Sequence, residues 1–427
     1  MEIKKHPEIV APAGDLNKLY YAVKYGADAI YLGLEKFSLR ERAENFSLDE
    51  LKQAISFAHN NHCKIYLTLN IFPHNVDLKG IENLVRDIKH LDLDAIIVSD
   101  IGVLEIVKNE MPDVNIHIST QANVTNWRTA KFYKGNGATR IILARELTLN
   151  EIKEIKEKVD VELEIFVHGA MCLAYSGRCV LSDYLTGRSA NKGDCAQVCR
   201  WEFKVIEAKR DDEVFDVIQE DDYTTILSSK DLRLIEHIPE LVNAQIDAFK
   251  IEGRVKSEYY VAIVTRAYRR VLDAYLKSPE KFKLDNYWVE ELDKVSHRPY
   301  FDGFLFEDQK AVEEQKDISQ TYEPPFYKRS YQFIGLVQNY DEQIGNGLKP
   351  FPTAKVLIKS QIQKGQTVEL VSYKYPDKEI IIDKIINEEG NEIEVANPTS
   401  FAFLDLGRDI DCYSILRKKG IEGEQTE

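Results

Sequence analysis

The sequence predicts an α/β fold, a (β/α)8 TIM-like barrel followed by a small C-terminal all-β barrel domain. Up to about residue 255, short runs rich in Val, Ile and Leu alternate with polar turns and helical stretches. Eight such runs are present. Eight parallel strands with crossover helices close a barrel. From Tyr331 onward the helical stretches give way to short alternating runs separated by Gly and Asp/Asn/Pro turns, which indicate a small all-β domain.

The barrel strands are expected where apolar runs end in Gly, Asn, Asp or Ser turns. In chain order they are Glu8 to Pro12, Ala29 to Gly33, Lys64 to Asn70, Ala95 to Ser99, Asn115 to Ser119, Arg140 to Leu143, Glu162 to Val167 and Ala248 to Glu252. Helical stretches such as Leu16 to Tyr25 and Leu48 to Asn60 fall between them. An open doubly wound sheet is the alternative, and the number of strands favours the closed barrel.

The length of 427 residues predicts more than one core, because single domains stop growing at about 250 to 300 residues. The expected parts are the barrel at 1–276 with a cysteine-bearing insertion at 168–230, a connector at 277–330, the β-barrel domain at 331–418 and a flexible tail at 419–427. Strands of the β domain are expected at Phe333 to Val337, Thr353 to Ile358, Gln366 to Ser372, Glu379 to Ile386 and Glu392 to Val395.

The composition is typical of a soluble globular protein, with 44% hydrophobic and 30% charged residues. No apolar run approaches the roughly 20 residues that span a bilayer, so no membrane segment is expected. The first residues, Met1 to Glu8, lack the apolar stretch of a secretory signal. We therefore expect a cytoplasmic protein whose cysteines stay reduced.

The formal net charge of -15 argues against indiscriminate binding of a polyanion, which depends on many lysines and arginines. A nucleic-acid partner would need a local basic face. One candidate is formed by Arg266, Arg269 and Arg270, which share one side of an expected helix. An ordinary solvated helix face explains the same pattern.

Polar residues follow the ends of most expected strands, where barrels of this kind carry their reactive groups. They are Asn70, Asp100, Thr120, Gln121, Arg145, Glu146, His168, Glu252 and Arg254. Arg145 or Arg254 could hold an anionic substrate, and His168 or Glu252 could transfer protons near neutral pH. The candidate catalytic residues are therefore His168, Glu252, Arg254, Arg145, Asn70 and Gln121. A loop-capping or ion-pair role would explain each of them singly.

Four of the six cysteines lie close together after the seventh strand, namely Cys172, Cys179, Cys195 and Cys199. Four thiolates near one point suit an iron-sulfur cluster or a tetrahedral zinc ion, because both favour sulfur ligands. The spacing does not separate the two metals. The short C-x2-C pairs of zinc ribbons are missing and a strand end lies beside the group, which favours the iron-sulfur cluster. Cys63 and Cys412 lie far away and are expected in the core.

The longest of several motifs is Glu164-Ile-Phe-Val-His-Gly-Ala-Met-Cys172, followed by Gly177-Arg-Cys179-Val-Leu-Ser182. These residues resemble the signature of the peptidase U32 (collagenase-like) family. Further likeness lies in Glu8-Ile-Val-Ala-Pro-Ala-Gly-Asp15, Gly26-Ala-Asp-Ala-Ile-Tyr-Leu-Gly33, Ser229-Lys-Asp-Leu232 and Lys250-Ile-Glu-Gly-Arg-Val-Lys256. Ala396-Asn-Pro398 and Ile415-Leu-Arg417 resemble the small β-barrel of longer members. The likeness therefore covers nearly the whole chain.

The resemblance implies two competing functions. One is proteolysis, but the sequence has no H-E-x-x-H zinc helix and no G-x-S-x-G elbow. Cys172 or Cys179 could act as a nucleophile with His168, yet four clustered cysteines are more readily ligands. The other function is oxygen-independent hydroxylation. Members that resemble this chain convert the wobble uridine of tRNA to 5-hydroxyuridine, and relatives act on ribosomal RNA or on the ubiquinone ring.

For the hydroxylating branch, the resemblance implies a 4Fe-4S cluster bound by Cys172, Cys179, Cys195 and Cys199. It also implies prephenate, a dicarboxylate co-substrate that Arg145 or Arg254 could hold. The expected function is prephenate-dependent hydroxylation of the tRNA wobble uridine, with the β domain helping to hold the tRNA. The alternatives are a U32-type peptidase, a hydroxylase of rRNA or another aromatic substrate, and a metal-stabilised RNA-binding module without catalysis.

Overall fold

The structure is a computed structural model that describes residues 6–39, 45–172, 174–201, 230–306, 328–341, 353–407 and 410–420. These residues form two compact units. The barrel unit holds those up to Val289 and those from His297 to residue 306, and the β unit holds Glu290–Ser296 and those from Lys328 onward. Parts of the predicted insertion (202–229) and connector (307–327), and most of the predicted tail (421–427), lie outside the described residues.

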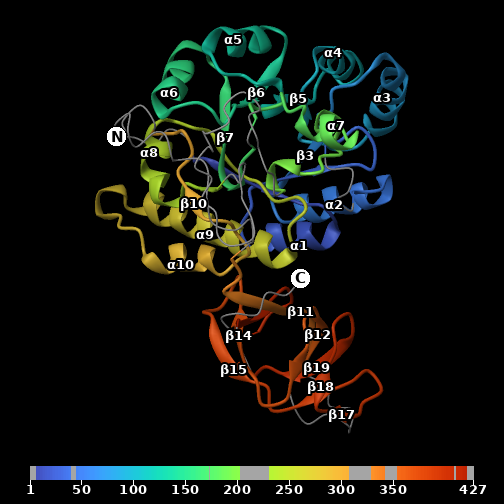
Figure 1. The fold of residues 1–427 in the computed structure, drawn as a ribbon, viewed down its shortest axis with the longest axis vertical. Helices are drawn as coiled ribbons and strands as arrows, with labels where there is room; N and C mark the ends of the chain where they lie inside the picture. Colours follow the sequence, from blue (N-terminus) through green and yellow to red (C-terminus); the bar gives the residue numbers. More distant parts are fainter. Residues whose placement is uncertain are drawn as a thin grey trace, which may run out of the picture. The chain divides into compact units, whose positions relative to one another are not determined.

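Eight parallel strands form a closed barrel, which confirms the predicted fold class (Figure 1). They are β1 (Glu8–Pro12), β2 (Ala29–Gly33), β3 (Lys64–Leu69), β4 (Ala95–Val98), β5 (Asn115–Ile118), β6 (Ala138–Ile142), β7 (Glu162–Ala170) and β9 (Ala248–Ile251). Each pairs with its neighbour in parallel, and β9 pairs with both β7 and β1, so the sheet closes on itself. Every predicted barrel strand coincides with one of these.

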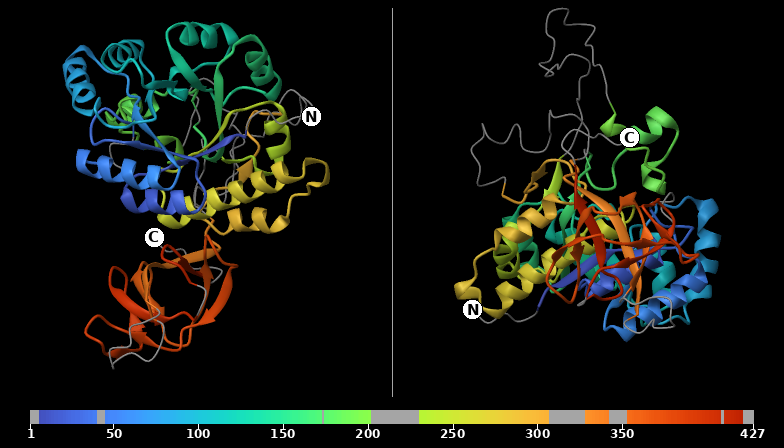
Figure 2. Two further views of the ribbon diagram at one scale, coloured as in Figure 1. Left: turned by 180° about the vertical axis from the view of Figure 1, so that it is seen from behind. Right: turned by 90° about the horizontal axis from the view of Figure 1, so that it is seen from below.

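Helices follow the strands and surround them, as Figures 1 and 2 show. They are α1 (Leu16–Lys24), α2 (Leu48–Asn60), α3 (Asn75–Ile88), α4 (Ile101–Glu110), α5 (Trp127–Gly135), α6 (Leu149–Lys158) and α9 (Glu258–Lys277). Residues at the strand ends cap several of them. Asp15 accepts the N–H of Lys18, and Asp100 accepts the N–H groups of Gly102 and Val103. Such caps satisfy N–H groups that the first helical turn leaves free. Among the described helices, none is both long and apolar enough to cross a membrane.

Four short elements have no counterpart among the predicted ones. They are helices α7 (Leu181–Thr186) and α8 (Ile238–Asn243) and strands β8 (Asp231–Arg233) and β10 (Tyr300–Phe301). The strand β8 pairs antiparallel with the last residues of β7, and β10 pairs with β8. These strands are too short to leave a periodic pattern in the sequence. Their partners are also distant along the chain, so no turn between neighbouring runs indicates the pairing.

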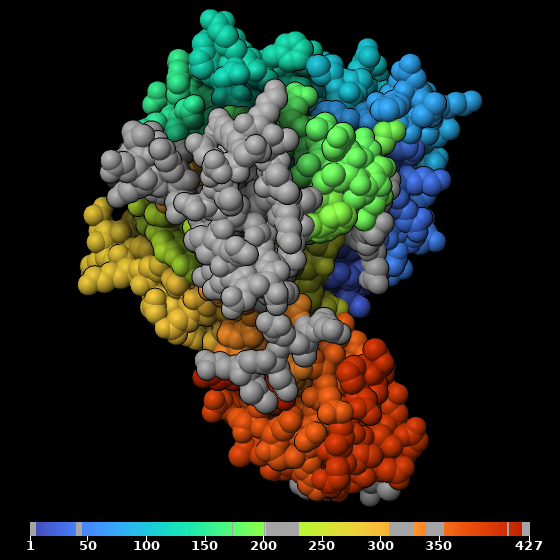
Figure 3. All heavy atoms as spheres, in the orientation of Figure 1, coloured from blue at the N-terminus to red at the C-terminus, as the bar shows by residue number. Residues whose placement is uncertain are grey.

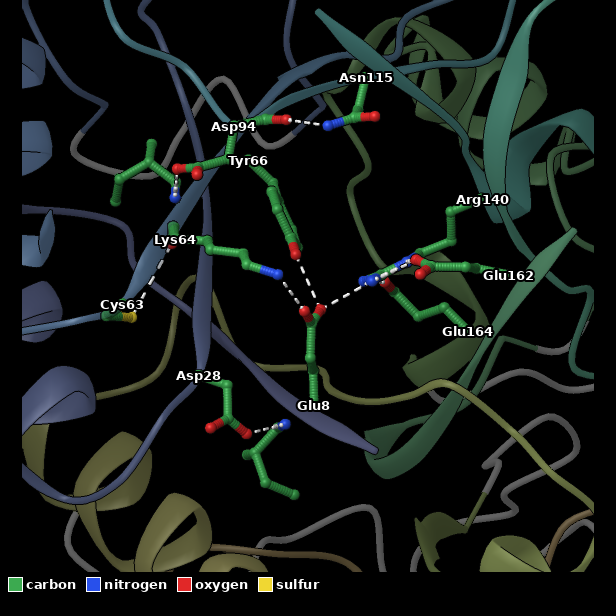
Figure 4. A network of polar contacts seen from close by, with 12 residues as sticks. Glu8, Asp28, Cys63, Lys64, Tyr66, Asp94, Asn115, Arg140, Glu162 and Glu164 are labelled. Carbon is green, nitrogen blue, oxygen red and sulfur yellow. Dashed lines mark hydrogen bonds and ion pairs between the residues drawn. The ribbon is translucent and has the colours of Figure 1, made fainter. Parts of the chain in front are cut away.

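The barrel interior is charged near the amino ends of its strands (Figure 4). Arg140 on β6 is 2% exposed and pairs with Glu162 and Glu164 on β7 at 2.7 and 3.0 Å. It also reaches Glu8 on β1 at 2.7 Å. This pair crosses the interior, because β1 and β6 are not neighbours in the sheet. Lys250 on β9 is buried and pairs with Glu164 at 2.7 Å. Most such barrels fill this space with Val, Ile and Leu.

Glu8 is the meeting point of this network. Its carboxylate accepts hydrogen bonds from Lys64 at 2.5 Å, Arg140 at 2.7 Å and Tyr66 at 2.8 Å. Burial raises the pKa of Glu8, but the charges and hydrogen bonds of Arg140 and Lys64 outweigh burial and lower this pKa to about 2. The carboxylate therefore stays ionised at neutral pH and joins strands β1, β3 and β6.

The β unit is all-β, as predicted, and its described strands pair antiparallel. Its larger sheet has the order β15 (Lys378–Ile381), β14 (Thr367–Val371), β20 (Ile415–Lys419), β11 (Tyr331–Asp341), β12 (Thr353–Ile358), β19 (Phe401–Asp405), β16 (Ile385–Ile386) and β17 (Glu392–Ile393). A second sheet pairs β13 (Ile362–Gln363) with β18 (Val395–Ala396). Inward-facing residues of both sheets share one apolar core. The strands β13, β19 and β20 have no counterpart among the predicted ones.

Candidate functional site

Two of the predicted site residues meet at the mouth of the barrel, where the strands have their carboxyl ends. Arg145, after β6, pairs with Glu252, after β9, at 3.2 Å, and both side chains are largely buried. Arg145 also donates to the carbonyl of Ala170 and lies 3.8 Å over the ring of Phe166. Its Nε–H has no hydrogen-bond partner among the described residues. A fixed guanidinium with a donor left over is suited to bind a carboxylate.

Arg254 is held by acceptors of the protein itself. Its Nη1 donates to the hydroxyl of Ser38 and the carbonyl of Leu39, both at 2.8 Å, and to the hydroxyl of Thr68 at 3.3 Å. Its Nη2 donates to the side chain of Asn45. The side chain is 3% exposed. Arg254 therefore ties the ends of β2 and β3 to the end of β9, and of the two arginines Arg145 is the better placed to hold a ligand.

Asn70 and Gln121 come together around one serine. Asn70 accepts the N–H of Leu39 at 3.2 Å, and its amide nitrogen donates to the hydroxyl of Ser119 at 3.5 Å. The backbone N–H of Gln121 donates to the same hydroxyl at 3.3 Å. Both predicted residues therefore lie on the side of the mouth that β3 and β5 form.

His168 points away from these groups. A register shift between Phe166 and His168 interrupts the pairing of β7 with β9. Phe166 lies against Arg145, whereas the ring of His168 packs against Tyr268 of α9. Its Nδ1 lies 3.4 Å from the hydroxyl of Tyr268, and its Nε2 lies 3.4 Å from the hydroxyl of Tyr300. Such an irregularity re-aims a side chain, here toward the helix layer.

The surroundings of His168 keep the imidazole neutral. Burial lowers its pKa well below the usual value, and the nearby His297 and Arg233 lower it further. The side chain is 1% exposed. A general base must come within hydrogen-bond reach of the proton that it takes. This geometry suits a residue that fixes the end of β7, four residues before Cys172.

The segment that carries the cysteines lies over the mouth (Figure 2). Glu146, at the end of β6, accepts the N–H of the residue before Gly177 at 2.8 Å. Gly177 has a φ of 71°, and a side chain there would lie 2.0 Å from the carbonyl of Gln121. The N–H of Phe72 donates to the carbonyl of Asn191 at 3.2 Å. The segment is therefore anchored on the ends of β3, β5 and β6.

Hydrogen bonds inside the segment hold its two halves together. The hydroxyl of Ser182 donates to the carbonyl of Arg188 at 2.7 Å and accepts the N–H of the residue after Cys195 at 2.9 Å. The side chain of Asn191 donates to the carbonyl of Cys179 at 3.1 Å, and that of Arg188 donates to the carbonyl of Cys195 at 3.3 Å. The backbone around Cys179 and Cys195 is thus fixed by neighbouring side chains.

None of the four cysteines forms a disulfide; Cys172 is exposed, and Cys179, Cys195 and Cys199 are half-buried. No three of their sulfur atoms lie within 4.8 Å of one another in the described structure. Sulfurs around one zinc ion lie about 3.8 Å apart, given tetrahedral Zn–S bonds of ~2.3 Å. Four thiolates are soft donors, which suit the irons of a 4Fe-4S cluster as well as a zinc ion, and in a cluster each thiolate binds a different iron.

One group of carboxylates in the β unit has the proximity of metal ligands, but its charge is already balanced. Oxygens of Glu291, Glu369 and Asp377 lie within 4.8 Å of one another. The fully buried Arg417 donates two hydrogen bonds to Glu291 and two to Glu369. Lys294 also pairs with Glu291 at 2.7 Å. The group is a buried ion-pair network that ties residues of α10 (Asn286–Asp293) to β14 and β20.

Most arginines of the predicted basic face on α9 are buried or paired with carboxylates of the barrel unit. Arg266 is 5% exposed and lies 5.6 Å over the ring of Trp288. Arg269 pairs with Asp28 at 2.9 Å and with Asp273 at 2.5 Å. Two of the three arginines therefore serve packing and ion pairing, which leaves no continuous basic strip there.

The fold and the site define a (β/α)8-barrel protein that carries four cysteines over a polar mouth and has an appended β domain. Residues 14–315 match Peptidase family U32, and residues 329–417 match the Peptidase family U32 C-terminal domain. The chain therefore belongs to peptidase family U32.

Curated relatives differ in the activity that their names state. The chain is 40% identical over 419 residues to tRNA hydroxylation protein P1 of Bacillus subtilis (strain 168), which covers 97% of this chain and 96% of that protein. It is 44% identical over 342 residues to an uncharacterized protease of Methanocaldococcus jannaschii, covering 79% and 81%. It is 36% identical over 312 residues to 23S rRNA 5-hydroxycytidine C2501 synthase of Escherichia coli (strain K12), covering 71% and 46%.

Proposed function

We propose that this protein is a tRNA-modifying enzyme that hydroxylates the wobble uridine to 5-hydroxyuridine with prephenate as co-substrate. The observation that carries the proposal is the 40% identity to tRNA hydroxylation protein P1 over 97% of this chain and 96% of that protein. This likeness includes the barrel and the β domain. The match to the 23S rRNA synthase covers only 46% of that protein. The full-length likeness therefore favours tRNA over rRNA.

The proposal includes a 4Fe-4S cluster held by Cys172, Cys179, Cys195 and Cys199. When bound, the cluster would supply one-electron redox chemistry. Hydrogen bonds to the ends of β3 and β6 support a segment whose thiols lie over the mouth. The N–H of Gln197 already donates to the sulfur of Cys195 at 3.4 Å, an interaction that stabilises a thiolate.

Arg145 is the residue that we propose to hold a carboxylate of prephenate. It is fixed by Glu252, Ala170 and Phe166, and its buried Nε–H has no hydrogen-bond partner among the described residues. The carboxylate of Glu252 pairs with the guanidinium of Arg145 and keeps it in place. Arg254 in this arrangement is a structural clamp, because its Nη atoms are engaged with Ser38 and Asn45.

Peptidase chemistry is the second candidate, since one relative is named a protease and another a collagenase. A cysteine nucleophile needs a base within hydrogen-bond reach. The enclosed and neutral His168, with its ring nitrogens facing Tyr268 and Tyr300, does not offer that base to Cys172 in this geometry. The described mouth therefore favours hydroxylation over proteolysis.

The decisive test is the nucleoside content of tRNA from a strain that lacks this chain and any second copy. Mass spectrometry should show that 5-hydroxyuridine and nucleosides derived from it are lost, and that expression of the full chain restores them. Ribosomal RNA of the same strain should keep its hydroxylated cytidine. If tRNA retains 5-hydroxyuridine, or if only the rRNA changes, the proposal is wrong.

Replacing Arg145 with alanine should lower the yield of 5-hydroxyuridine about 10- to 100-fold, because a hydrogen bond to a charged group contributes roughly 1.5 to 3 kcal/mol. With purified protein, the prephenate concentration for half-maximal rate should rise. Arg145→Lys should recover part of the loss, since it keeps the charge but not the planar fork. Lys79→Ala is the control, because Lys79 is exposed on α3. An unchanged prephenate dependence in Arg145→Ala would exclude this role.

A further inference from the structure

The outer face of α5 carries an uncompensated positive charge. Arg128, Lys131 and Lys134 are exposed on it, and the helix contains no acidic residue. Between them lies Phe132, whose side chain is 52% exposed. None of the three cations has a carboxylate partner among the described residues. We call these four residues the α5 strip. The helix forms part of the outer surface of the barrel unit, in teal in Figure 3.

Several cations on other helices of the barrel are neutralised. Arg86 on α3 pairs with Glu110 at 2.9 Å, and Arg269 on α9 pairs with Asp28 at 2.9 Å. Lys158 on α6 pairs with Glu154. Unpaired lysines also occur elsewhere on the barrel unit, but on α5 three unpaired cations surround an exposed aromatic ring, in a chain with a net charge of -15. This contrast points to an anionic partner that also presents flat rings.

The inner side of α5 connects the strip to the mouth. Tyr133 on that side is 8% exposed. Burial and the carboxylate of Asp100 raise the pKa of Tyr133, and Arg178 lowers it, so both charges lie close to this ring. Asp100 follows β4 at the mouth, and Arg178 directly precedes Cys179. Arg178 is exposed and has no carboxylate partner among the described residues. Tyr133 therefore lies between Asp100 and Arg178, so the inner side of α5 is close to the cysteine segment.

We propose that the α5 strip binds the substrate tRNA, with Arg128, Lys131 and Lys134 on backbone phosphates and an unpaired base stacked on Phe132. Lysines and arginines that contact phosphates supply most of the sequence-independent affinity for nucleic acids. An exposed aromatic ring among them stacks on bases without sequence preference. This inference rests on the proposed function. It places part of the tRNA-binding surface on the barrel unit rather than on the β domain alone.

The strip can be tested by the salt dependence of tRNA binding to the full chain. Arg128, Lys131 and Lys134 are changed together to glutamine, and binding of a tRNA transcript is followed by fluorescence anisotropy between about 50 and 200 mM salt. The slope of log affinity against log salt should become shallower by about 2 to 3, because roughly 0.7 to 0.9 counterions are released per phosphate contact. Affinity should fall roughly 10- to 100-fold at the higher salt.

Two further variants separate the parts of the strip. Phe132→Ala should weaken binding about tenfold with an unchanged salt slope, because stacking releases no counterions. Lys277, Lys281 and Lys283, which are exposed and have no carboxylate partner among the described residues, are changed together to glutamine as a charge-matched control. This control should bind tRNA like the wild type. Circular dichroism checks that all variants are folded.

The outcomes distinguish this inference from the proposed function. If the wild type binds tRNA and the α5 triple variant binds with the same affinity and slope, the strip is not the tRNA surface and the proposed function stands. The same conclusion follows if the control variant of Lys277, Lys281 and Lys283 loses as much tRNA affinity as the α5 triple variant. It also follows if the α5 triple variant no longer binds anionic phosphatidylserine vesicles but still binds tRNA like the wild type. If the wild type itself fails to bind tRNA at low salt, the proposed function fails and the inference with it.

Discussion

Changing any one of Cys172, Cys179, Cys195 and Cys199 to serine is expected to lower the hydroxylation of tRNA by at least about 100-fold. Loss of a group that merely supports a metal ligand already costs roughly 10- to 100-fold, and loss of a ligand itself costs more. The measurement is 5-hydroxyuridine in tRNA from a deletion strain that carries each variant. Protein purified without oxygen should be brown and contain about four iron and four sulfide per chain, and the variants should lose most of both.

Cys412→Ser provides the matched control, because Cys412 is a half-buried cysteine of the β unit that forms no disulfide. It should keep the iron content and the activity of the wild type. A variant of one of the four cysteines that modifies tRNA as well as the wild type would remove that residue from the ligand set. Stoichiometric zinc in place of iron, in protein that remains active, would contradict the iron-sulfur proposal.

Replacing Arg140 with methionine should lower the free energy of unfolding of the barrel unit by about 3 to 5 kcal/mol, which is typical when one partner of a buried ion pair is removed. The change leaves the carboxylates of Glu8, Glu162 and Glu164 without their shared guanidinium. Urea unfolding followed by tryptophan fluorescence is a suitable measurement, because Trp127, Trp201 and Trp288 all belong to the barrel unit.

An exposed arginine gives the comparison. Arg86→Met removes a pair with Glu110 at 2.9 Å, but its side chain is 49% exposed, so a loss below about 1 kcal/mol is expected. The pH dependence adds a second check. The pKa of Glu8 is about 2 in the folded protein and 4.5 in the unfolded chain. The ionised Glu8 therefore stabilises the fold fully above pH 4.5, and this stabilisation is lost as pH falls toward 2. This loss should be smaller in Arg140→Met. Equal effects of both arginine variants would show that the interior network contributes little.

The strands of the barrel could be predicted because they are buried on both faces. Runs such as Ala29–Gly33 and Ala95–Val98 are continuously apolar and end in a turn residue, so they stand out in the sequence. In the β unit the pattern is less clear. The outward residues of Phe401–Asp405 include two phenylalanines, and the buried Arg417 lies in Ile415–Lys419. Alternation of apolar and polar residues is hidden in both strands, which were therefore missed.

The sequence by itself determined that this chain is an eight-stranded barrel with polar residues at the strand ends and four cysteines after the seventh strand. Only the tertiary structure decided which of those residues meet. Arg145 forms an ion pair with Glu252. Arg254 donates hydrogen bonds to a loop from the other side of the mouth, and His168 packs against α9. The physical reason is that strand register and a single irregularity in β7 set the direction of each side chain. Partners that lie a hundred residues apart leave no local trace in the sequence.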